Sequence, residues 1–273
     1  MTAEDHSRSG ILEEMTIEDV EAFDPEIVVF GLGSTEPHGP HLPYGTDVFQ
    51  VDALCRRTVT RANDRGARAL MYPTLPIGNN VNFTAYPFAC RIGVRTLMNV
   101  VLDVVEAIEE EGVRKVVLVN GHGGNTDTLR ATLREHAGRN SPGEGAFLCL
   151  AGALKSSSTD PDHIVEHPSP HAGESETSRI MHLRPDLVRG EELDGFPMRE
   201  PTVDGLDSDR VEFVPPWHGF MPESAGGETR ESSAEKGEAI IDETADWLAD
   251  FLVDLEAAEI HAEFPYPEHG EEE

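Results

Sequence analysis

The stretch GSTEPHGPHLPYGTD, residues 33–47, places carboxylates and imidazoles in one short loop. Glu36 and His38 lie two residues apart, so in an extended loop their side chains point the same way. Asp47 follows nine residues after His38, beyond two prolines that stiffen the path. Carboxylate and imidazole ligands suit divalent Zn, Mn or Fe. The loop therefore predicts a metal site, against the alternative of an aspartate helix cap among surface polar residues.

Two further segments carry groups of the same kind. The turn VNGHGGN supplies His122 among glycines, which let a backbone approach a ligand closely. A structural histidine or a phosphate-binding turn is the alternative there, although the turn lacks the GK[ST] of a P-loop. The segment SPHAGESETS carries His171, Glu174 and Glu176. Glu174 lies three residues after His171, a spacing that puts both on one face of a helix; an acidic first helical turn is the simpler interpretation.

Together the three segments supply enough ligands for two metal ions. Two ions about 3.5 Å apart, sharing one carboxylate, need roughly five ligands. His171 is then left as a catalytic proton carrier, and His41 is expected to brace the loop. Of the two glutamates, one can face the site while the other braces the helix start. The expected ligands are Glu36, His38, Asp47, His122 and Glu174, with Glu174 also counted as catalytic. The residues expected to orient ligands or line the substrate pocket are Asn125, Glu176, Gly123 and Trp217.

Strands and helices must position these groups, and the apolar runs indicate which. Continuous apolar runs ending in glycine or asparagine predict buried strands, and 3.6-residue periodicity predicts helices. Their alternation predicts an α/β fold of three layers, a mainly parallel sheet flanked by helices, in which sites gather at the carboxyl ends of strands. Strands are expected within 26–34, 67–78, 113–120 and 145–152. Helices are expected within 16–23, 47–63, 94–112, from 126, within 171–183 and within 233–259.

Composition limits the partners and the compartment. Formal net charge is −31, from 52 acidic and 21 basic residues, so nucleic acid and anionic membranes are not expected partners. A surface so rich in acid, with only three lysines, favours a halophilic source, the alternative being a very acidic mesophilic protein. No run of eighteen apolar residues or signal core occurs, and the three cysteines are far apart. We therefore expect a cytoplasmic protein of one domain, residues 1–273, with a disordered tail from about residue 264.

In order and spacing, GSTEPHGPHLPYGTD, NGHGGN and HAGESETS resemble the creatininase (creatinine amidohydrolase) family. The resemblance spans residues 26–183, with a looser match in the closing helix. It implies a central parallel sheet, a homo-oligomer that is commonly a hexamer, and two divalent metal ions per chain, often Zn and Mn. It also implies hydrolysis of a C–N amide bond in a small cyclic or linear amide through a metal-bridged hydroxide. By the same resemblance Glu36 and His122 hold one metal, His38 holds the other, and Asp47 bridges both.

The chain departs from family members that open creatinine at two positions. Those members carry a metal-binding glutamate two residues after the turn histidine, where this chain has Gly124. They also carry Glu-His where this chain has Pro170-His171, and we expect Glu174 to replace the missing ligand. Formamide hydrolysis and the peptide trimming of cofactor biosynthesis are the alternative activities within the family. A non-catalytic metal or small-molecule binding protein, or a nucleotide-binding module, is the alternative of another class.

Overall fold

A four-stranded parallel sheet carries the fold. The structure is a computed structural model that describes residues 10–141, 143–152, 164–190, 195–206 and 210–268. Within them the strand order is β2-β1-β3-β4. The central strands β1 and β3 are buried along their whole length, which explains why both read as unbroken apolar runs. The strands are β1 (Ile27–Leu32), β2 (Ala69–Leu75), β3 (Lys115–Asn120) and β4 (Phe147–Ala151).

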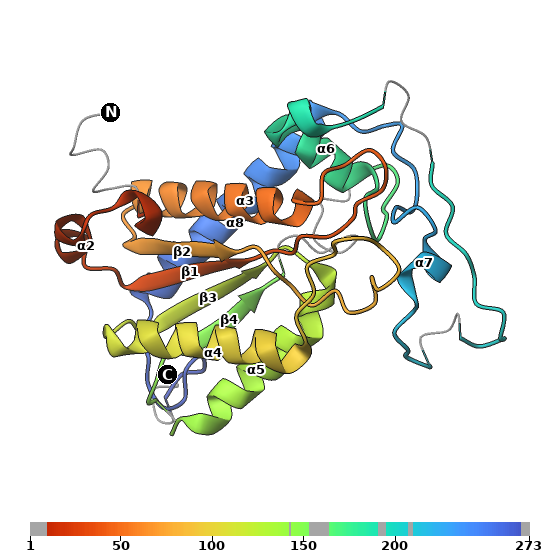
Figure 1. Cartoon of the computed structure of the whole chain (residues 1–273). Helices are drawn as coiled ribbons and strands as arrows, with labels where there is room; N and C mark the ends of the chain where they lie inside the picture. The colour runs from red at the N-terminus through yellow and green to blue at the C-terminus, as the bar shows by residue number, and fades with distance from the viewer. Residues whose placement is uncertain (1–9, 142, 153–163, 191–194, 207–209, 269–273) are drawn as a thin grey trace.

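Helices cover both faces of the sheet, which confirms the predicted three-layer α/β fold (Figure 1). On one face, α3 (Thr46–Asp64) and α8 (Ala234–Ala257) pack side chains such as Leu54 and Leu248 against β1 and β3. On the other face, α4 (Val94–Glu110) and α5 (Thr126–Arg139) do the same with Leu97 and Leu129. The central strands are therefore shielded from solvent, and only the loops at their ends can form a site.

Short elements complete the described chain. They are η1 (Leu12–Glu14), α2 (Ile17–Phe23), η2 (Gly123–Asn125), α6 (Glu174–Leu183), η3 (Pro185–Leu187) and α7 (Trp217–Phe220). Thr16 caps α2: the Thr16 hydroxyl accepts the N–H of Asp19 at 3.3 Å, and the Asp19 carboxylate accepts the N–H of Thr16 at 2.9 Å.

Helix α6 begins later than the sequence predicts. The expected start was His171, but the helix begins at Glu174, because Ala172 has a φ of 52°, in the left-handed region that a right-handed helix cannot include. His171 therefore lies in the preceding loop, and the prediction that it shares a helical face with Glu174 is wrong. α6 packs tightly on α8: a Cβ at Gly237 would lie 2.0 Å from the Ser178 carbonyl oxygen.

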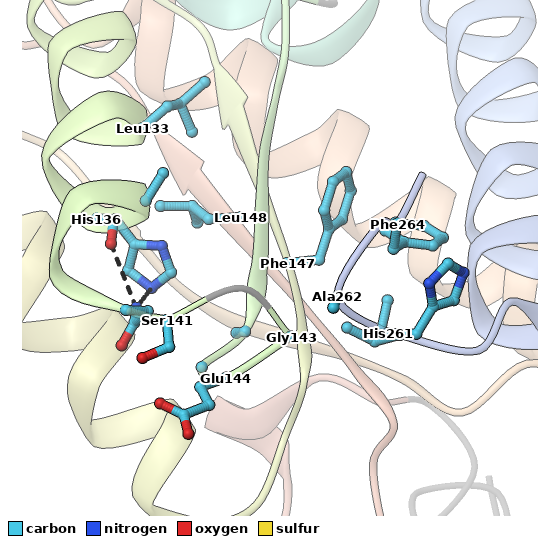
Figure 2. Close-up of a pocket in the computed structure, with 15 residues that line it drawn as sticks. Leu133, His136, Ser141, Gly143, Glu144, Phe147, Leu148, His261, Ala262 and Phe264 are labelled. Atoms are coloured by element: carbon cyan, nitrogen blue, oxygen red, sulfur yellow. Dashed lines mark hydrogen bonds between the residues drawn. The ribbon is translucent and has the colours of Figure 1, made fainter. Parts of the chain in front are cut away.

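The end of the described chain is anchored at the amino end of the sheet. The rings of Phe264 and Phe147 meet edge to face with centroids 4.7 Å apart. Both rings line a cavity of about 300 Å³ beside β4, at the opposite end of the sheet from the predicted site (Figure 2). Residues 269–273 lie outside the described part. Each helix described is too short or too polar to cross a lipid bilayer.

Candidate metal centre

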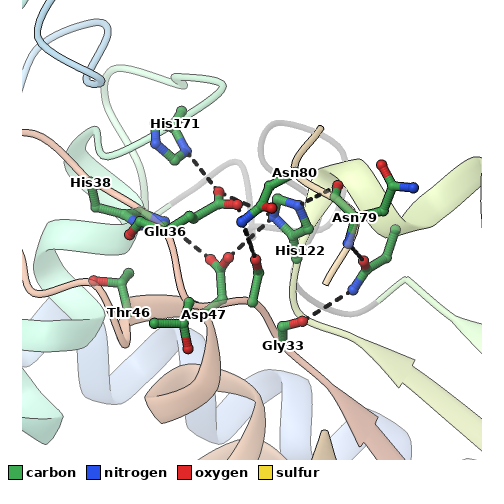
Figure 3. A network of polar contacts seen from close by, with 12 residues as sticks. Gly33, Glu36, His38, Thr46, Asp47, Asn79, Asn80, His122 and His171 are labelled. Carbon is green, nitrogen blue, oxygen red and sulfur yellow. Dashed lines mark hydrogen bonds and ion pairs between the residues drawn. The ribbon is translucent and has the colours of Figure 1, made fainter. Parts of the chain in front are cut away.

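The three predicted segments meet at the carboxyl ends of β1 and β3 (Figure 3). β2 and β3 lie on opposite sides of β1; α3, which connects β1 to β2, and α4, which connects β2 to β3, cover opposite faces of the sheet. The direction of chain progression thus reverses at β1, which is where open α/β sheets place their ligand sites. The loops after β1 and β3 bring their side chains to the site from the side of the sheet. The loop before α6 brings His171 from the opposite side (Figure 3).

Six side chains form what we call the carboxylate–imidazole cluster: Glu36, His38, Asp47, His122, His171 and Glu176. Three subsets of it have ligand atoms that all lie within 4.8 Å of one another. Asp47 belongs to two of the subsets, with Glu36 and His122 in one and with His38 and Glu176 in the other. One carboxylate shared between two groups of three is the arrangement that a dinuclear metal site needs.

A backbone carbonyl fixes one ring nitrogen of each histidine that shares a subset with Asp47. His38 Nδ1 donates to the Glu36 carbonyl at 3.0 Å, and His122 Nε2 donates to the Asn79 carbonyl at 3.1 Å. The other nitrogen of each ring faces carboxylates. His38 Nε2 lies 3.1 Å from Asp47 Oδ1, and His122 Nδ1 lies 3.1 Å from Asp47 Oδ2 and 3.2 Å from Glu36 Oε1. This is how a protein orients imidazoles toward a metal.

His171 follows the same pattern at a longer distance. Its Nε2 donates to the Pro37 carbonyl at 3.0 Å, and its Nδ1 lies 4.0 Å from Glu36 Oε1. The His171 and His38 rings lie with centroids 4.2 Å apart. Burial, followed by the charge of His38, lowers the pKa of His171 below its ordinary value. A neutral imidazole with a free nitrogen facing the cluster is suited to accept a proton.

The cluster is electrostatically suited to cations. Glu36 Oε1 and Asp47 Oδ2 are buried and accept no hydrogen bond from the described residues, which is costly for carboxylate oxygens. Burial lowers the pKa of His38, but the charge of Asp47, helped by Glu176 and Glu36, outweighs it and raises the pKa to about 10. Burial also lowers the pKa of His122, but the nearby carboxylates, first Glu36 and then Asp47, outweigh it and raise the pKa well above its ordinary value. Imidazole and carboxylate donors around uncompensated negative charge fit divalent Zn, Mn or Fe.

Glu174 does not belong to this cluster, which corrects the expectation that it is the fifth ligand and a catalytic group. Its carboxylate accepts the backbone N–H groups of Glu166 and His167 and the ammonium of Lys236. Because successive helical residues are rotated by about 100°, Glu176 points away from Glu174 and toward the cluster. Glu176 Oε2 lies 3.9 Å from His38 Nε2, and it accepts the Ala172 N–H at 2.5 Å.

The other predicted residues differ in how they meet the cluster. Asn125 joins two loops: its Oδ1 accepts the Asn79 N–H at 2.8 Å and its Nδ2 donates to the Gly33 carbonyl at 3.2 Å. Trp217 meets the His171 ring edge to face at 5.2 Å. Gly123 is exposed, and apart from its chain neighbours a Cβ there would meet no atom within 4 Å.

His41 braces the loop, as predicted. Its Nε2 lies 3.0 Å from the Thr177 hydroxyl and its ring stacks on Phe196 with centroids 4.9 Å apart. The pKa of His41 is lowered to about 4, chiefly by burial, so the ring is neutral where it packs.

Sequence reasoning missed Ser34, Asn79 and Asn80. Asn80 Nδ2 donates to the Ser34 hydroxyl at 3.1 Å, which in turn donates to Glu36 Oε2 at 3.1 Å, and so holds that carboxylate (Figure 3). The Asn79 carbonyl approaches so closely that a Cβ at Gly124 would lie 2.1 Å from its oxygen. The position of Asn79 and Asn80 directly after a predicted strand was a possible sequence signal for a role at the site. It was not sufficient, because only the strand order shows that this strand neighbours β1.

Comparisons with known proteins agree with one another. A sequence model of the creatininase (creatinine amidohydrolase) family matches residues 13–252. The mycofactocin precursor peptide peptidase of Mycobacterium ulcerans (strain Agy99) is 29% identical over 200 residues, covering 71% of this chain and 73% of the relative. The creatinine amidohydrolase of Pseudomonas putida is 26% identical over 246 residues, covering 83% and 88%. A crystal structure from Bacteroides fragilis NCTC 9343, provisionally assigned as a creatinine amidohydrolase, matches with a TM-score of 0.81 at 25% identity, covering 93% and 99%.

Proposed function

The chain belongs to the creatininase family, and from this premise and the carboxylate–imidazole cluster we propose that it is a dinuclear-metal-dependent amidohydrolase. It hydrolyses a C–N amide bond in a small cyclic or linear amide. One observation carries the proposal above all: two buried histidines are each fixed by a backbone carbonyl on one nitrogen while the other nitrogen faces buried carboxylates. A non-catalytic metal-binding protein would need that orientation too, but it would not need a further imidazole, His171, with one nitrogen facing the cluster.

The proposed ligand sets follow the two subsets that share Asp47. Glu36 and His122 would hold one divalent ion and His38 and Glu176 the other, with Asp47 common to both sets. Glu176 takes the place that the sequence had suggested for Glu174. The mixture of imidazole nitrogens and carboxylate oxygens suits Zn or Mn, with Fe as a third candidate.

The chain's own residues then account for proton movement. The chemistry supplied by a bound pair of divalent ions is Lewis acidity toward the amide carbonyl and a water that ionises near neutral pH. His171 accepts the water's proton at Nδ1, because Nε2 is held by the Pro37 carbonyl, and returns it to the leaving nitrogen. Trp217 and Phe83, stacked with centroids 4.9 Å apart, form an aromatic wall beside His171 that supports an orienting role toward the substrate.

A peptide amide is the second candidate substrate. It is favoured by the similarity to peptide peptidases named above and by Gly124, which leaves no side chain where creatinine-opening members of the family carry a glutamate. The same catalytic groups serve a peptide and a cyclic amide, because both reactions break an amide C–N bond.

Elemental analysis of the purified protein tests the proposal, with close to two divalent ions per chain as the expected result. EDTA should remove the ions together with activity, and Mn or Zn should restore both. A panel of creatinine, formamides, dihydropyrimidine-type rings and short peptides then identifies the substrate class. A protein that binds no divalent ion, or whose activity survives full chelation, would contradict the proposal.

Glu176→Gln should leave about one ion per chain and lower kcat/KM by about 100-fold or more, since a loss of several kcal/mol of charge stabilisation is expected when one ion is lost. The amide keeps the size of the side chain but lacks the negative charge that faces His38. Elemental analysis and steady-state kinetics provide the two readouts. Glu235→Gln, at an exposed position in the first turn of α8, is the matched control and should keep two ions. Full metal occupancy in Glu176→Gln would remove Glu176 from the ligand set.

We also propose that residues 1–273 act as one domain, in the cytoplasm, as a homo-oligomer of the hexameric type known in the family. The free cysteines Cys55, Cys90 and Cys149 support a reducing compartment, and the single sheet supports one domain. Light scattering coupled to gel filtration tests the hexamer, for which the expected mass is about six times 29.9 kDa.

The thermal midpoint should rise as KCl is raised from about 0.1 M to several molar, because salt screens the repulsion within a chain of net charge −31. An opposing effect exists: Arg57 and Arg61 of α3, and Arg65 directly after it, pair with aspartates of α8, and screening weakens such pairs. These pairs are partly exposed, at roughly 0–1 kcal/mol each, so repulsion should dominate. Differential scanning calorimetry across KCl concentrations measures the shift, and a midpoint that falls or stays constant would argue against a halophilic origin.

A further inference from the structure

Building on the proposed function, we infer that Glu174 and Lys236 are positioning residues for the reaction: together they anchor the loop that carries His171. Neither residue touches the carboxylate–imidazole cluster within the described contacts. They act on loop 164–173, which has no regular secondary structure and connects to the first residue of α6.

Glu174 closes this loop on itself. Its carboxylate accepts the Glu166 N–H at 3.1 Å and the His167 N–H at 2.7 Å, so the chain returns after eight residues to the point where α6 begins. Glu174 is only 1% exposed. A buried carboxylate satisfied by two backbone donors is a strong, directional anchor, since charge-assisted hydrogen bonds exceed neutral ones.

Lys236 supplies the charge that makes burial of Glu174 tolerable. Its ammonium lies 2.7 Å from Glu174 Oε1 and 2.9 Å from Glu166 Oε1, and it comes from the first turn of α8. Helix α8 is fixed there, because Ser233 caps it and Gly237 lies against Ser178. The loop is thereby tied to the best-packed helix pair of this region, α6 and α8.

The other end of the loop is held by separate contacts, and His171 lies between the two anchors. The His171 carbonyl accepts the Gly226 N–H at 3.0 Å, and the next residue, Ala172, donates its N–H to Glu176 at 2.5 Å. Ala172 keeps a φ of 52°, a conformation that costs a non-glycine residue free energy and persists only when its surroundings impose it. Release of the Glu174 anchor therefore frees Glu166 and His167 and leaves His171 held only by the contacts at the other end of the loop.

The experiment compares Glu174→Gln, Lys236→Met and Lys236→Arg with the full-length wild-type protein. Hydrogen exchange at the Glu166 and His167 amides should accelerate at least tenfold in the first two variants, because their acceptor is weakened or freed. Metal content should stay at two ions per chain. The kcat should fall by about 10- to 100-fold with KM nearly unchanged, as for residues that orient catalytic groups from outside the site. Lys236→Arg should recover most of the kcat, since the charge is kept.

Lys115→Met is the matched control. Lys115 also donates its ammonium within the fold, to the Glu256 carbonyl at 2.7 Å, but it lies at the amino end of β3. This variant can lose stability, yet loop exchange and kcat should match the wild type. A fall in kcat equal to that of Lys236→Met would reduce the effect to general destabilisation and overturn the inference.

The exchange measurement separates this inference from the proposed function, because it needs neither metal nor substrate. Unchanged exchange at Glu166 and His167 in both Glu174→Gln and Lys236→Met would overturn the anchor even in an active amidohydrolase. Loss of an ion in Glu174→Gln would return Glu174 to the ligands and overturn it as well. A wild-type protein without metal or activity would refute the proposed function, and with it the catalytic part of the inference, while accelerated exchange would still establish the anchor.

Discussion

Asp47→Asn should remove both metal ions and lower kcat/KM by about a thousand-fold or more, which corresponds to roughly 4 kcal/mol of transition-state stabilisation. Asp47 is the one carboxylate common to both proposed ligand sets. Its two oxygens face different histidines, Oδ1 toward His38 and Oδ2 toward His122. An asparagine keeps the shape but presents one neutral oxygen and one N–H donor, so one of the two sets loses its oxygen and both lose the shared charge.

Elemental analysis and kinetics on the same preparation measure this effect. Asp52→Asn is the matched control, because Asp52 lies one turn further along α3 and bonds to Arg56 and Thr74 instead of the cluster. It should keep two ions and near wild-type activity. Retention of both ions in Asp47→Asn would refute the bridging role.

His171→Ala should keep two ions per chain and lower kcat by about 100- to 10,000-fold, the usual range for loss of a general acid–base group. His171 lies at the edge of the cluster, with its Nδ1 4.0 Å from Glu36 Oε1. Its loss leaves Asp47, His38 and His122 in place. His261→Ala, at the opposite end of the sheet, is the matched control and should leave kcat unchanged (Figure 2). If His171→Ala loses an ion while folding normally, His171 is a ligand and another group must carry the proton.

The pH dependence gives a second readout for His171. Burial lowers the pKa of His171, so the ring is neutral and basic above a pKa that lies below the ordinary imidazole value. Activity that depends on the neutral ring is therefore present at neutral pH and is lost as the pH falls through that lowered pKa. Conservative replacement by glutamine should remove this acidic limb from the residual activity.

The sequence predicted the sheet and most of the cluster because those depend on local patterns. Apolar runs ending in glycine or asparagine marked β1 and β3, and the ligand types followed them directly, so their meeting could be deduced from the rule for parallel sheets. The fold class needed only the alternation of strands and helices.

The choice between Glu174 and Glu176 could not be made in the same way. It depends on which residue begins α6, and a shift of a few residues rotates every side chain on the helix. The start is set by the left-handed Ala172 and by the Lys236 contact from a distant helix, neither of which leaves a local pattern. The role of Asn79 could not be predicted for a related reason, because it depends on β2 lying beside β1.

The close approach between Gly124 and Asn79 has an evolutionary consequence. A glutamate at position 124 would bring a Cβ to 2.1 Å from the carbonyl oxygen that orients His122. A carboxylate at position 124 therefore cannot be gained in this chain by one substitution without displacing the carbonyl that orients His122. The two positions are therefore coupled: the loop containing Asn79 must move before residue 124 can acquire a side chain.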